Sequence, residues 1–209
     1  MQKNKQFLVW SIVFLLSYSG KVAAQDQLSG TITYQQITRY SFDFILAELE
    51  NDQRIKDRLA TMPEKGISVQ VLAFNSKKAL FKEDDSEKEA ISPMLQNHLF
   101  YESSLKPPSP VLQEIYYDFE KNQKLEQMEY LTRMFLLKSE IAPLAWKLGS
   151  EKKKILEYTC MGATMNMDDQ EIVAWFAPEL PVSLGPANFG GLPGLVLVIL
   201  QNLRQFSVF

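Results

Sequence analysis

The chain has 209 residues, of which 46% are hydrophobic, enough to bury a core, and it carries 22 basic against 25 acidic side chains. This slightly acidic balance argues against a nucleic-acid partner, because phosphate binding needs clustered lysine and arginine. Cys160 is the only cysteine, so the chain cannot form a disulfide within itself and must gain its stability from packing.

Residues 1–24 have the pattern of a secretory signal peptide. Two lysines form a positive start, residues 7–18 (FLVWSIVFLLSY) are apolar, and small residues lead up to Ala24. The apolar run is shorter than the ~20 residues that span a bilayer, so we expect cleavage after Ala24 and no transmembrane segment afterwards. Loss of three lysines leaves 19 basic and 25 acidic side chains, a formal charge of −6. We therefore expect an exported protein, periplasmic or secreted, with one domain over residues 25–209.

The segment that follows predicts strands with one helical insertion. Residues 29–40 are rich in Thr, Ile and Tyr with rough alternation, which is typical of a strand. Residues 42–62 place apolar side chains at mostly helical spacing among charges, which predicts a helix that Pro63 ends. Residues 67–74 and 78–82 then predict two strands around a turn.

Residues 83–110 differ in character, because an acidic run followed by three prolines predicts a long solvated connection. Beyond it, short apolar segments predict further strands at residues 114–119, 124–131, 146–148, 154–165 and 171–176. Asp168 and Asp169 predict the turn between the last two of these strands. The sum is a mainly β (α+β) fold: a single domain built on a twisted antiparallel sheet or half-barrel with one helical insertion.

Residues 185–200 (GPANFGGLPGLVLVIL) place glycines and prolines directly before an unbroken apolar run. Pro193 and Gly194 suit the second and third positions of a type II turn. Residues 195–200 are six apolar side chains in succession, which predicts a strand covered on both faces. A phosphate-binding loop would need a different glycine spacing, and Pro193 lacks an amide donor.

The same region resembles the GLPGLI family, exported proteins of the Bacteroidetes group. The resemblance rests on a Lys-Ile-Leu-x-Tyr-x-Cys strand, an Ala-Trp-Phe strand, a Pro-Val-Ser-x-Gly-Pro segment and the hexapeptide Gly191, Leu192, Pro193, Gly194, Leu195 and Val196. It implies export and a β-rich fold, but no biochemical activity, because none is established for the family. Glu157 departs from the family's glycine. Members usually continue for several strands after the hexapeptide, so a truncated copy is a hypothesis, in which strand 195–200 would lack a neighbour.

Candidate catalytic residues are few. Cys160 and the only histidine, His98, would have to lie within hydrogen-bond reach to form a cysteine hydrolase, whereas a cysteine in mid-strand is commonly a core residue. Asp168 and Asp169 are neighbours, as expected of turn formers rather than an acid pair. We predict no metal site and no cofactor, because one histidine and one cysteine cannot assemble a standard zinc site.

Aromatic side chains supply the candidate binding residues. Trp146, Trp175 and Phe176 could line an apolar pocket, although aromatic strand residues more often belong to a core. The leading hypothesis is a non-enzymatic envelope protein whose sheet presents a concave face to an apolar ligand or an envelope protein partner, a loose fold analogy with open half-barrel carriers of lipidated proteins. The alternatives are a hydrolase that uses Cys160 and a secreted assembly or adhesion module.

Overall fold

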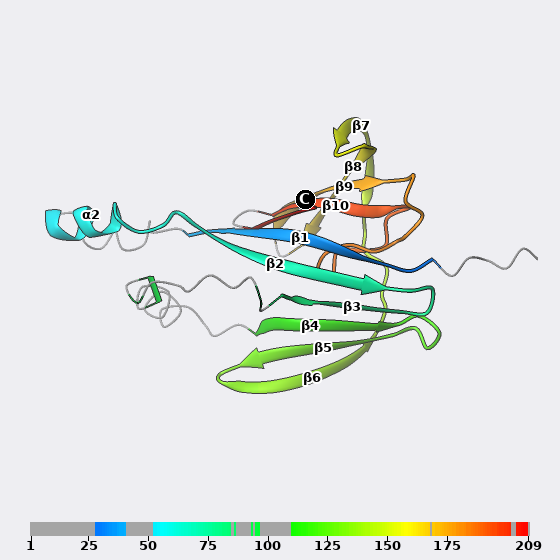
Figure 1. The fold of residues 1–209 in the computed structure, drawn as a ribbon, viewed down its shortest axis with the longest axis horizontal. Helices are drawn as coiled ribbons and strands as arrows, with labels where there is room; N and C mark the ends of the chain where they lie inside the picture. Colours follow the sequence, from blue (N-terminus) through cyan, green and yellow to red (C-terminus); the bar gives the residue numbers. More distant parts are fainter. Residues whose placement is uncertain are drawn as a thin grey trace, which may run out of the picture.

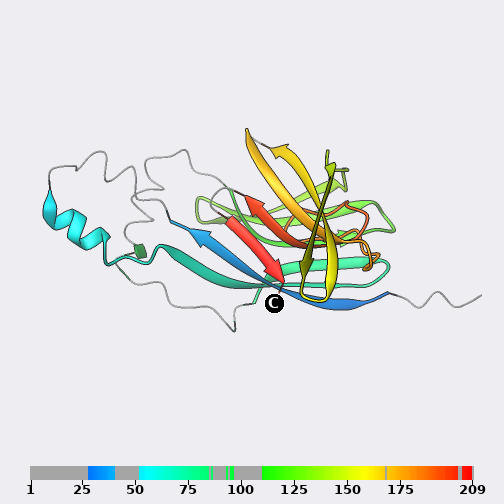
Figure 2. The same cartoon turned by 90° about the horizontal axis from the view of Figure 1, so that it is seen from above.

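The computed structural model describes residues 28–40, 52–84, 86, 93, 95–96, 110–167, 169–201 and 204–208. The expected signal peptide and most of the 83–110 connection therefore lie outside the described residues. Helix α2 spans Gln53–Leu59, within the expected helical insertion, and projects beyond the ends of β1 and β2 (Figures 1 and 2). The strands are β1 (Gly30–Arg39), β2 (Lys65–Phe74), β3 (Lys78–Glu83), β4 (Val111–Asp118), β5 (Gln123–Tyr130), β6 (Arg133–Glu140), β7 (Lys147–Ile155), β8 (Tyr158–Met167), β9 (Gln170–Ala177), β10 (Leu195–Gln201) and β11 (Arg204–Val208).

All eleven strands form one open antiparallel sheet, in the order β6-β5-β4-β3-β2-β1-β11-β10-β9-β8-β7. The sheet consists of two meanders, β1–β6 and β7–β11, which are joined by the pairing of β1 with β11 (Figure 1). Tyr34 of β1 lies opposite Val208 of β11 at one end of this pair. The predicted mainly β fold and antiparallel sheet are confirmed.

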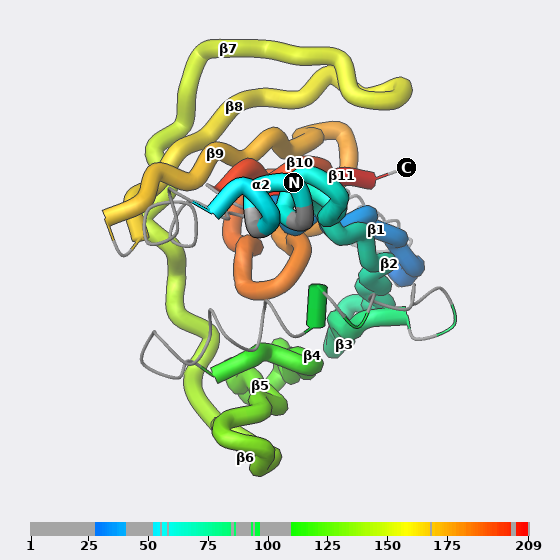
Figure 3. The backbone as a smooth tube through the Cα atoms, turned by 90° about the vertical axis from the view of Figure 1, so that its left-hand side faces the viewer, coloured from blue at the N-terminus to red at the C-terminus, as the bar shows by residue number. Residues whose placement is uncertain are grey.

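The link between the two meanders requires the sheet to curl. Residues 141–146 connect β6 to β7, which are the two outer strands of the sheet. A flat sheet of this size would hold its edges about 48 Å apart at ~4.8 Å per strand, whereas seven extended residue steps reach only about 25 Å. Viewed along the strands, the sheet accordingly bends into an open curve, with the 141–146 link crossing the open side (Figure 3).

Residues 178–194, which we call the inner loop, lie inside this curve (Figure 3). The loop folds back on itself: Gly191 N donates to Ser183 O at 3.0 Å, and Val196 N donates to Leu184 O at 2.9 Å. Its buried side chains join those of the sheet's inner face in one core, which includes Tyr34, Leu72, Phe81, Ile115, Phe176, Leu184, Phe189, Leu192 and Phe206. The concave face of the sheet is thus packed against the chain's own loop.

The apolar run after Pro193 forms the buried strand that was predicted. Five of its six side chains are buried in β10, and only Leu200 is exposed. The strand lies between β9 and β11, so it does not form an unprotected edge. No strand was predicted at residues 204–208, where β11 pairs with β10 on the side away from β9.

The turn before β10 differs from the predicted type II turn. Gly194 N donates to Leu192 O at 2.8 Å, which closes a three-residue turn around Pro193. Gly194 has a φ of +153°, and a Cβ atom there would collide with the carbonyl oxygen of Ala177. Glycine is therefore needed here both for its backbone angle and for the close approach of a neighbouring chain segment.

The predicted strand at residues 154–165 is wrong in one respect. The chain reverses at Leu156 and Glu157, so that Ile155 of β7 lies opposite Tyr158 of β8. Leu156 adopts a φ of +52°. Neither residue belongs to the Gly, Asn or Asp types that usually mark such a turn, which is why the sequence pattern did not show it.

Candidate functional site

A cleft of about 430 Å³ opens between the β4–β5 hairpin, the 141–146 link and the inner loop. We call it the Asn188 cleft. Most of its wall is apolar, and the polar groups of Tyr117, Lys124 and Asn188 lie together at one part of it. The lining residues are Tyr117, Phe119, Lys124, Ile141, Ala142, Pro143, Leu144, Ser183, Leu184, Gly185, Asn188, Gly190 and Gly191.

A closed polar cluster ties the inner loop to strand β5 beside this cleft. Asn188 Oδ1 accepts a hydrogen bond from Lys124 Nζ at 3.1 Å, and Asn188 Nδ2 donates to Glu126 Oε1 at 2.8 Å. Lys124 Nζ also pairs with Glu126 Oε2 at 3.0 Å. Lys124 and Glu126 point to the same face because side chains two apart on a strand do so. The pair places both a cation and an anion in a largely buried site, where each compensates the other.

Tyr117 extends the cluster from the neighbouring strand. Its hydroxyl donates to the carbonyl oxygen of Ala187 at 3.1 Å, and the side-chain oxygen Oδ1 of Asn188 lies 3.5 Å from the same hydroxyl. Burial raises the pKa of Tyr117 well above its usual range, and the nearby Glu126 carboxylate raises it further. The phenol therefore stays protonated and serves as a hydrogen-bond donor. Its ring stacks on Phe119, with the ring centroids 6.0 Å apart.

The three aromatic candidates do not gather in one pocket. Trp146 belongs to the link at the cleft, and its Nε1 donates to Gly190 O at 2.9 Å. Phe176 is buried in the core. Trp175 is its neighbour on β9 and points to the opposite face, where Lys153 Nζ lies 5.6 Å from the ring centroid. Trp146 thus hydrogen-bonds a residue that lines the cleft, and none of the three aromatic residues belongs to the lining itself.

Cys160 is fully buried in the core. Its Sγ lies 3.9 Å from the carbonyl oxygen of Tyr158. Burial raises the pKa of the thiol, and the Glu179 carboxylate adds to this rise, which disfavours the thiolate that a nucleophile needs. His98 and Asp168 lie outside the described residues, and Asp169 occupies a turn with a φ of +58°.

Two further observations concern other classes of site. Within the described part of the chain, no group of three or more His, Cys, Asp and Glu side chains could hold a metal ion. The helices described there include none that is long and apolar enough to cross a bilayer.

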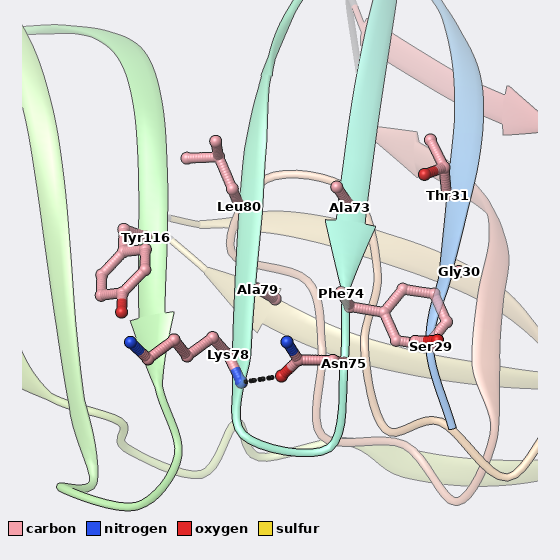
Figure 4. Close-up of a pocket in the computed structure, with 10 residues that line it drawn as sticks. All are labelled: Ser29, Gly30, Thr31, Ala73, Phe74, Asn75, Lys78, Ala79, Leu80 and Tyr116. Carbon is pink, nitrogen blue, oxygen red and sulfur yellow. Dashed lines mark hydrogen bonds between the residues drawn. The ribbon is translucent and has the colours of Figure 1, made fainter. Parts of the chain in front are cut away.

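A second hollow, of about 470 Å³, lies on the outer face at the β2–β3 turn (Figure 4). Its polar groups serve the local turn: Asn75 Oδ1 accepts from the backbone N–H groups of Lys77 and Lys78. Lys78 Nζ lies 6.0 Å from the ring centroid of Tyr116. Because the Asn75 side chain is engaged in holding the turn, we regard the Asn188 cleft as the better candidate site.

Comparison with known families gives one short match. Residues 165–198 match the model of a family described as a protein of unknown function (Porph_ging). The match extends over less than half of the chain, and it includes residues 191–196, on which the GLPGLI resemblance rests; the GLPGLI name itself is not confirmed. No curated protein matches the chain.

Comparison with solved structures gives matches to structures of PNGF-II. The structure of PNGF-II in space group P21 matches with a TM-score of 0.50 and 19% identity, over 86% of this chain and 27% of that chain. The structure of PNGF-II in space group C2 gives a TM-score of 0.48 and 18% identity, over 85% of this chain and 27% of that chain. This chain therefore spans about a quarter of the length of PNGF-II. The likeness concerns the fold alone.

The polar cluster of the cleft was missed in the sequence. Lys124 and Glu126 were correctly placed in a predicted strand, and their spacing puts both on one face. Nothing in the pattern, however, indicates that Asn188 reaches them from a loop more than sixty positions away. The small-residue run at 185–191 was the available signal that this loop packs closely against something.

Proposed function

We propose that the chain is an exported, non-enzymatic binding protein whose half-barrel holds a small amphipathic ligand in the Asn188 cleft. The observation that carries this proposal is the composition of the cleft, which combines an apolar wall with one localised polar cluster. Its volume falls within the ~300–1,000 Å³ of small-molecule sites, which are typically apolar with a few placed polar groups. The signal-peptide pattern of residues 1–24 supports export.

The apolar wall favours a flexible hydrocarbon as the body of the ligand. Ile141, Pro143 and Leu144 contribute from the link, and Leu184 contributes from the inner loop. Burying each methylene of a ligand is worth about 0.8 kcal/mol, so a short acyl chain gains appreciable affinity from this wall.

The polar cluster favours recognition over catalysis. Lys124 has three N–H donors, of which the described residues use two, for Asn188 and Glu126. The remaining donor suits an oxygen at the polar end of a ligand. Since Glu126 neutralises the ammonium, the cluster is better suited to hold such a group than to activate a nucleophile.

Binding of a dansyl-labelled undecanoic acid to the purified chain tests the proposal. Ala142 is exposed on the cleft wall, and Ala145 is exposed on the same link but does not line the cleft. We expect saturable binding by the unmodified chain, a loss of at least about tenfold in affinity for Ala142→Trp, and no change for Ala145→Trp. Thermal unfolding should show that both variants remain folded.

Two outcomes would overturn the proposal. One is the absence of saturable binding to the unmodified chain. The other is an equal loss of affinity in both tryptophan variants, which would place the probe elsewhere on the surface.

A further inference from the structure

Strand β6 is an open edge that presents large apolar side chains. It pairs with β5 along all eight of its residues, and no described strand pairs with its other side. Four consecutive apolar side chains, those of Met134, Phe135, Leu136 and Leu137, have exposed fractions between 45% and 67%. Because successive strand residues alternate, these side chains are exposed on both faces of the sheet. An exposed apolar edge with unpaired backbone groups is a template for a further strand.

The opposite edge of the sheet is built differently. Strand β7 carries lysines at 147, 152, 153 and 154, and its register with β8 shifts between Leu148 and Lys152. Charged side chains and an irregular backbone are the usual means by which an edge strand avoids pairing. On β6, by contrast, the charged residues Arg133, Lys138 and Glu140 lie outside the apolar segment 134–137, and the register with β5 is unbroken, so this segment of the edge has neither kind of protection.

We propose that β6 pairs antiparallel with β6 of a second copy of this chain, across a two-fold axis at Leu136. A two-fold axis normal to the sheet preserves its faces, so each residue must lie opposite one of the same parity. With Leu136 opposite its own copy, Phe135 lies opposite Leu137, and Met134 lies opposite the aliphatic stem of Lys138. Arg133 then lies opposite Ser139, so no like charges face each other.

The alternative registers and partners fit less well. An axis at Phe135 would also oppose apolar side chains, but it would pair only residues 133–137 of the strand, whereas an axis at Leu136 pairs residues 133–139. An axis at Leu137 would place Leu136 against Lys138, Met134 against Glu140 and Phe135 against Ser139, which separates the apolar side chains. Pairing of β6 with β7 of another copy would oppose apolar residues to lysines, and it would generate an open chain of molecules rather than a closed dimer. The β6 sequence is thus most complementary to itself.

The size of the contact sets the expected affinity. A single strand pair buries less than the ~1,200 Å² of stable specific interfaces, so the dimer should be reversible, with a dissociation constant on the order of 1–100 μM. Such a dimer would extend the sheet continuously across the axis, and the backbone groups of residues 133–139 that point away from β5 would gain partners.

Sedimentation velocity over a concentration series tests the proposal, with Leu136→Lys as the disrupting variant. Leu148→Lys is the matched control, because Leu148 is also largely exposed and lies on the other edge strand. We expect the unmodified chain and L148K to dimerise alike, and L136K to remain monomeric at about tenfold higher concentration. A monomeric unmodified chain, a persistent L136K dimer or an equal effect of L148K would overturn the proposal.

Cross-linking tests the register independently. In the proposed dimer the two Leu136 side chains face each other, with Cβ atoms about 4.5–5.5 Å apart, whereas the two Leu137 side chains lie diagonally, about 7–8 Å apart. In a Cys160→Ala background, Leu136→Cys should therefore form an intermolecular disulfide faster than Leu137→Cys. Equal or reversed rates would rule out this register. Protection of the β6 edge amides in a monomer would instead assign the edge to another segment of the same chain.

Discussion

The hydroxyl of Tyr34 donates a 2.8 Å hydrogen bond to the carbonyl oxygen of Val196, a residue 162 positions away in the sequence. Tyr34 lies on β1, and β11 separates β1 from β10. The pairing of β10 with β11 begins only at Val198, so the earlier part of β10 has no β11 partner on that side. Burial raises the pKa of Tyr34 far above its usual range, which keeps the hydroxyl protonated as a donor.

Tyr34→Phe should therefore destabilise the protein by about 1–3 kcal/mol, because it removes the partner of a buried carbonyl group. Tyr116→Phe is the control, since Tyr116 faces outward on β4, and its effect should stay within about 0.5 kcal/mol. Urea denaturation followed by tryptophan fluorescence measures both free energies of unfolding. Equal effects of the two substitutions would contradict the role given to Tyr34.

Gly194→Ala should be much more damaging than Gly191→Ala. Both glycines have positive φ angles, but an added Cβ at Gly194 would collide with Ala177, whereas at Gly191 it would meet nothing within 4 Å. We expect a cost of about 1–2 kcal/mol for Gly191→Ala from backbone strain alone. Gly194→Ala should exceed this by at least about 2 kcal/mol or fail to fold, as judged by denaturation and by soluble yield. Similar costs at the two positions would show that the close approach is unimportant.

The thiol of Cys160 should resist alkylation in the folded protein. The side chain is fully buried, and its pKa is raised by that burial. Iodoacetamide should leave the native chain unmodified and should label it completely in concentrated guanidinium chloride, as read by mass spectrometry. Ala145→Cys supplies a positive control, because position 145 is exposed. Rapid labelling of Cys160 in native buffer would favour the hydrolase hypothesis instead.

Asp118 should make the stability of the protein depend on acid pH. The hydrogen-bonded Lys121 ammonium holds the pKa of the Asp118 carboxyl below its ordinary value of 3.8. A carboxyl whose pKa is lower in the folded state stabilises the fold above its unfolded pKa, and this contribution is lost as the pH falls through the folded pKa.

Asp118→Asn tests this dependence, because the amide keeps an acceptor for Lys121 N–H but carries no charge. We expect the unmodified chain to be the more stable of the two at neutral pH, and the difference to shrink as the pH falls below 3.8. Denaturation at a series of pH values measures the difference. A gap that is unchanged down to about pH 2 would contradict the ion pair's contribution.

Local patterns predicted most of the strands, and contacts between distant segments explain what they missed. Alternation and turn residues located β1–β5 and β9, and the apolar run located β10. The turn at Leu156 was missed because tertiary context holds a poor turn former there. Strand β11 was missed because it is short and its pairing with β1 joins the ends of the described chain.

The candidate site was less predictable than the fold. The three aromatic residues chosen from the sequence lie in different places, because neighbouring strand residues point to opposite faces. The Asn188 cleft depends instead on where the inner loop rests inside the curved sheet. That position follows from the length of the 141–146 link and from glycine contacts, and a single sequence carries no direct signal of either.

The pairing of β1 with β11 also sets an order for folding. When the chain emerges from its N-terminus onward, β1–β6 can assemble early by successive hairpins, but one side of β1 stays unpaired until residues 204–208 arrive. The apolar inner surface of that first meander likewise stays uncovered until residues 178–194 have been made. A contact between segments so distant along the chain forms slowly, so folding passes through an intermediate with exposed apolar surface. A chaperone would have to cover that surface to prevent aggregation.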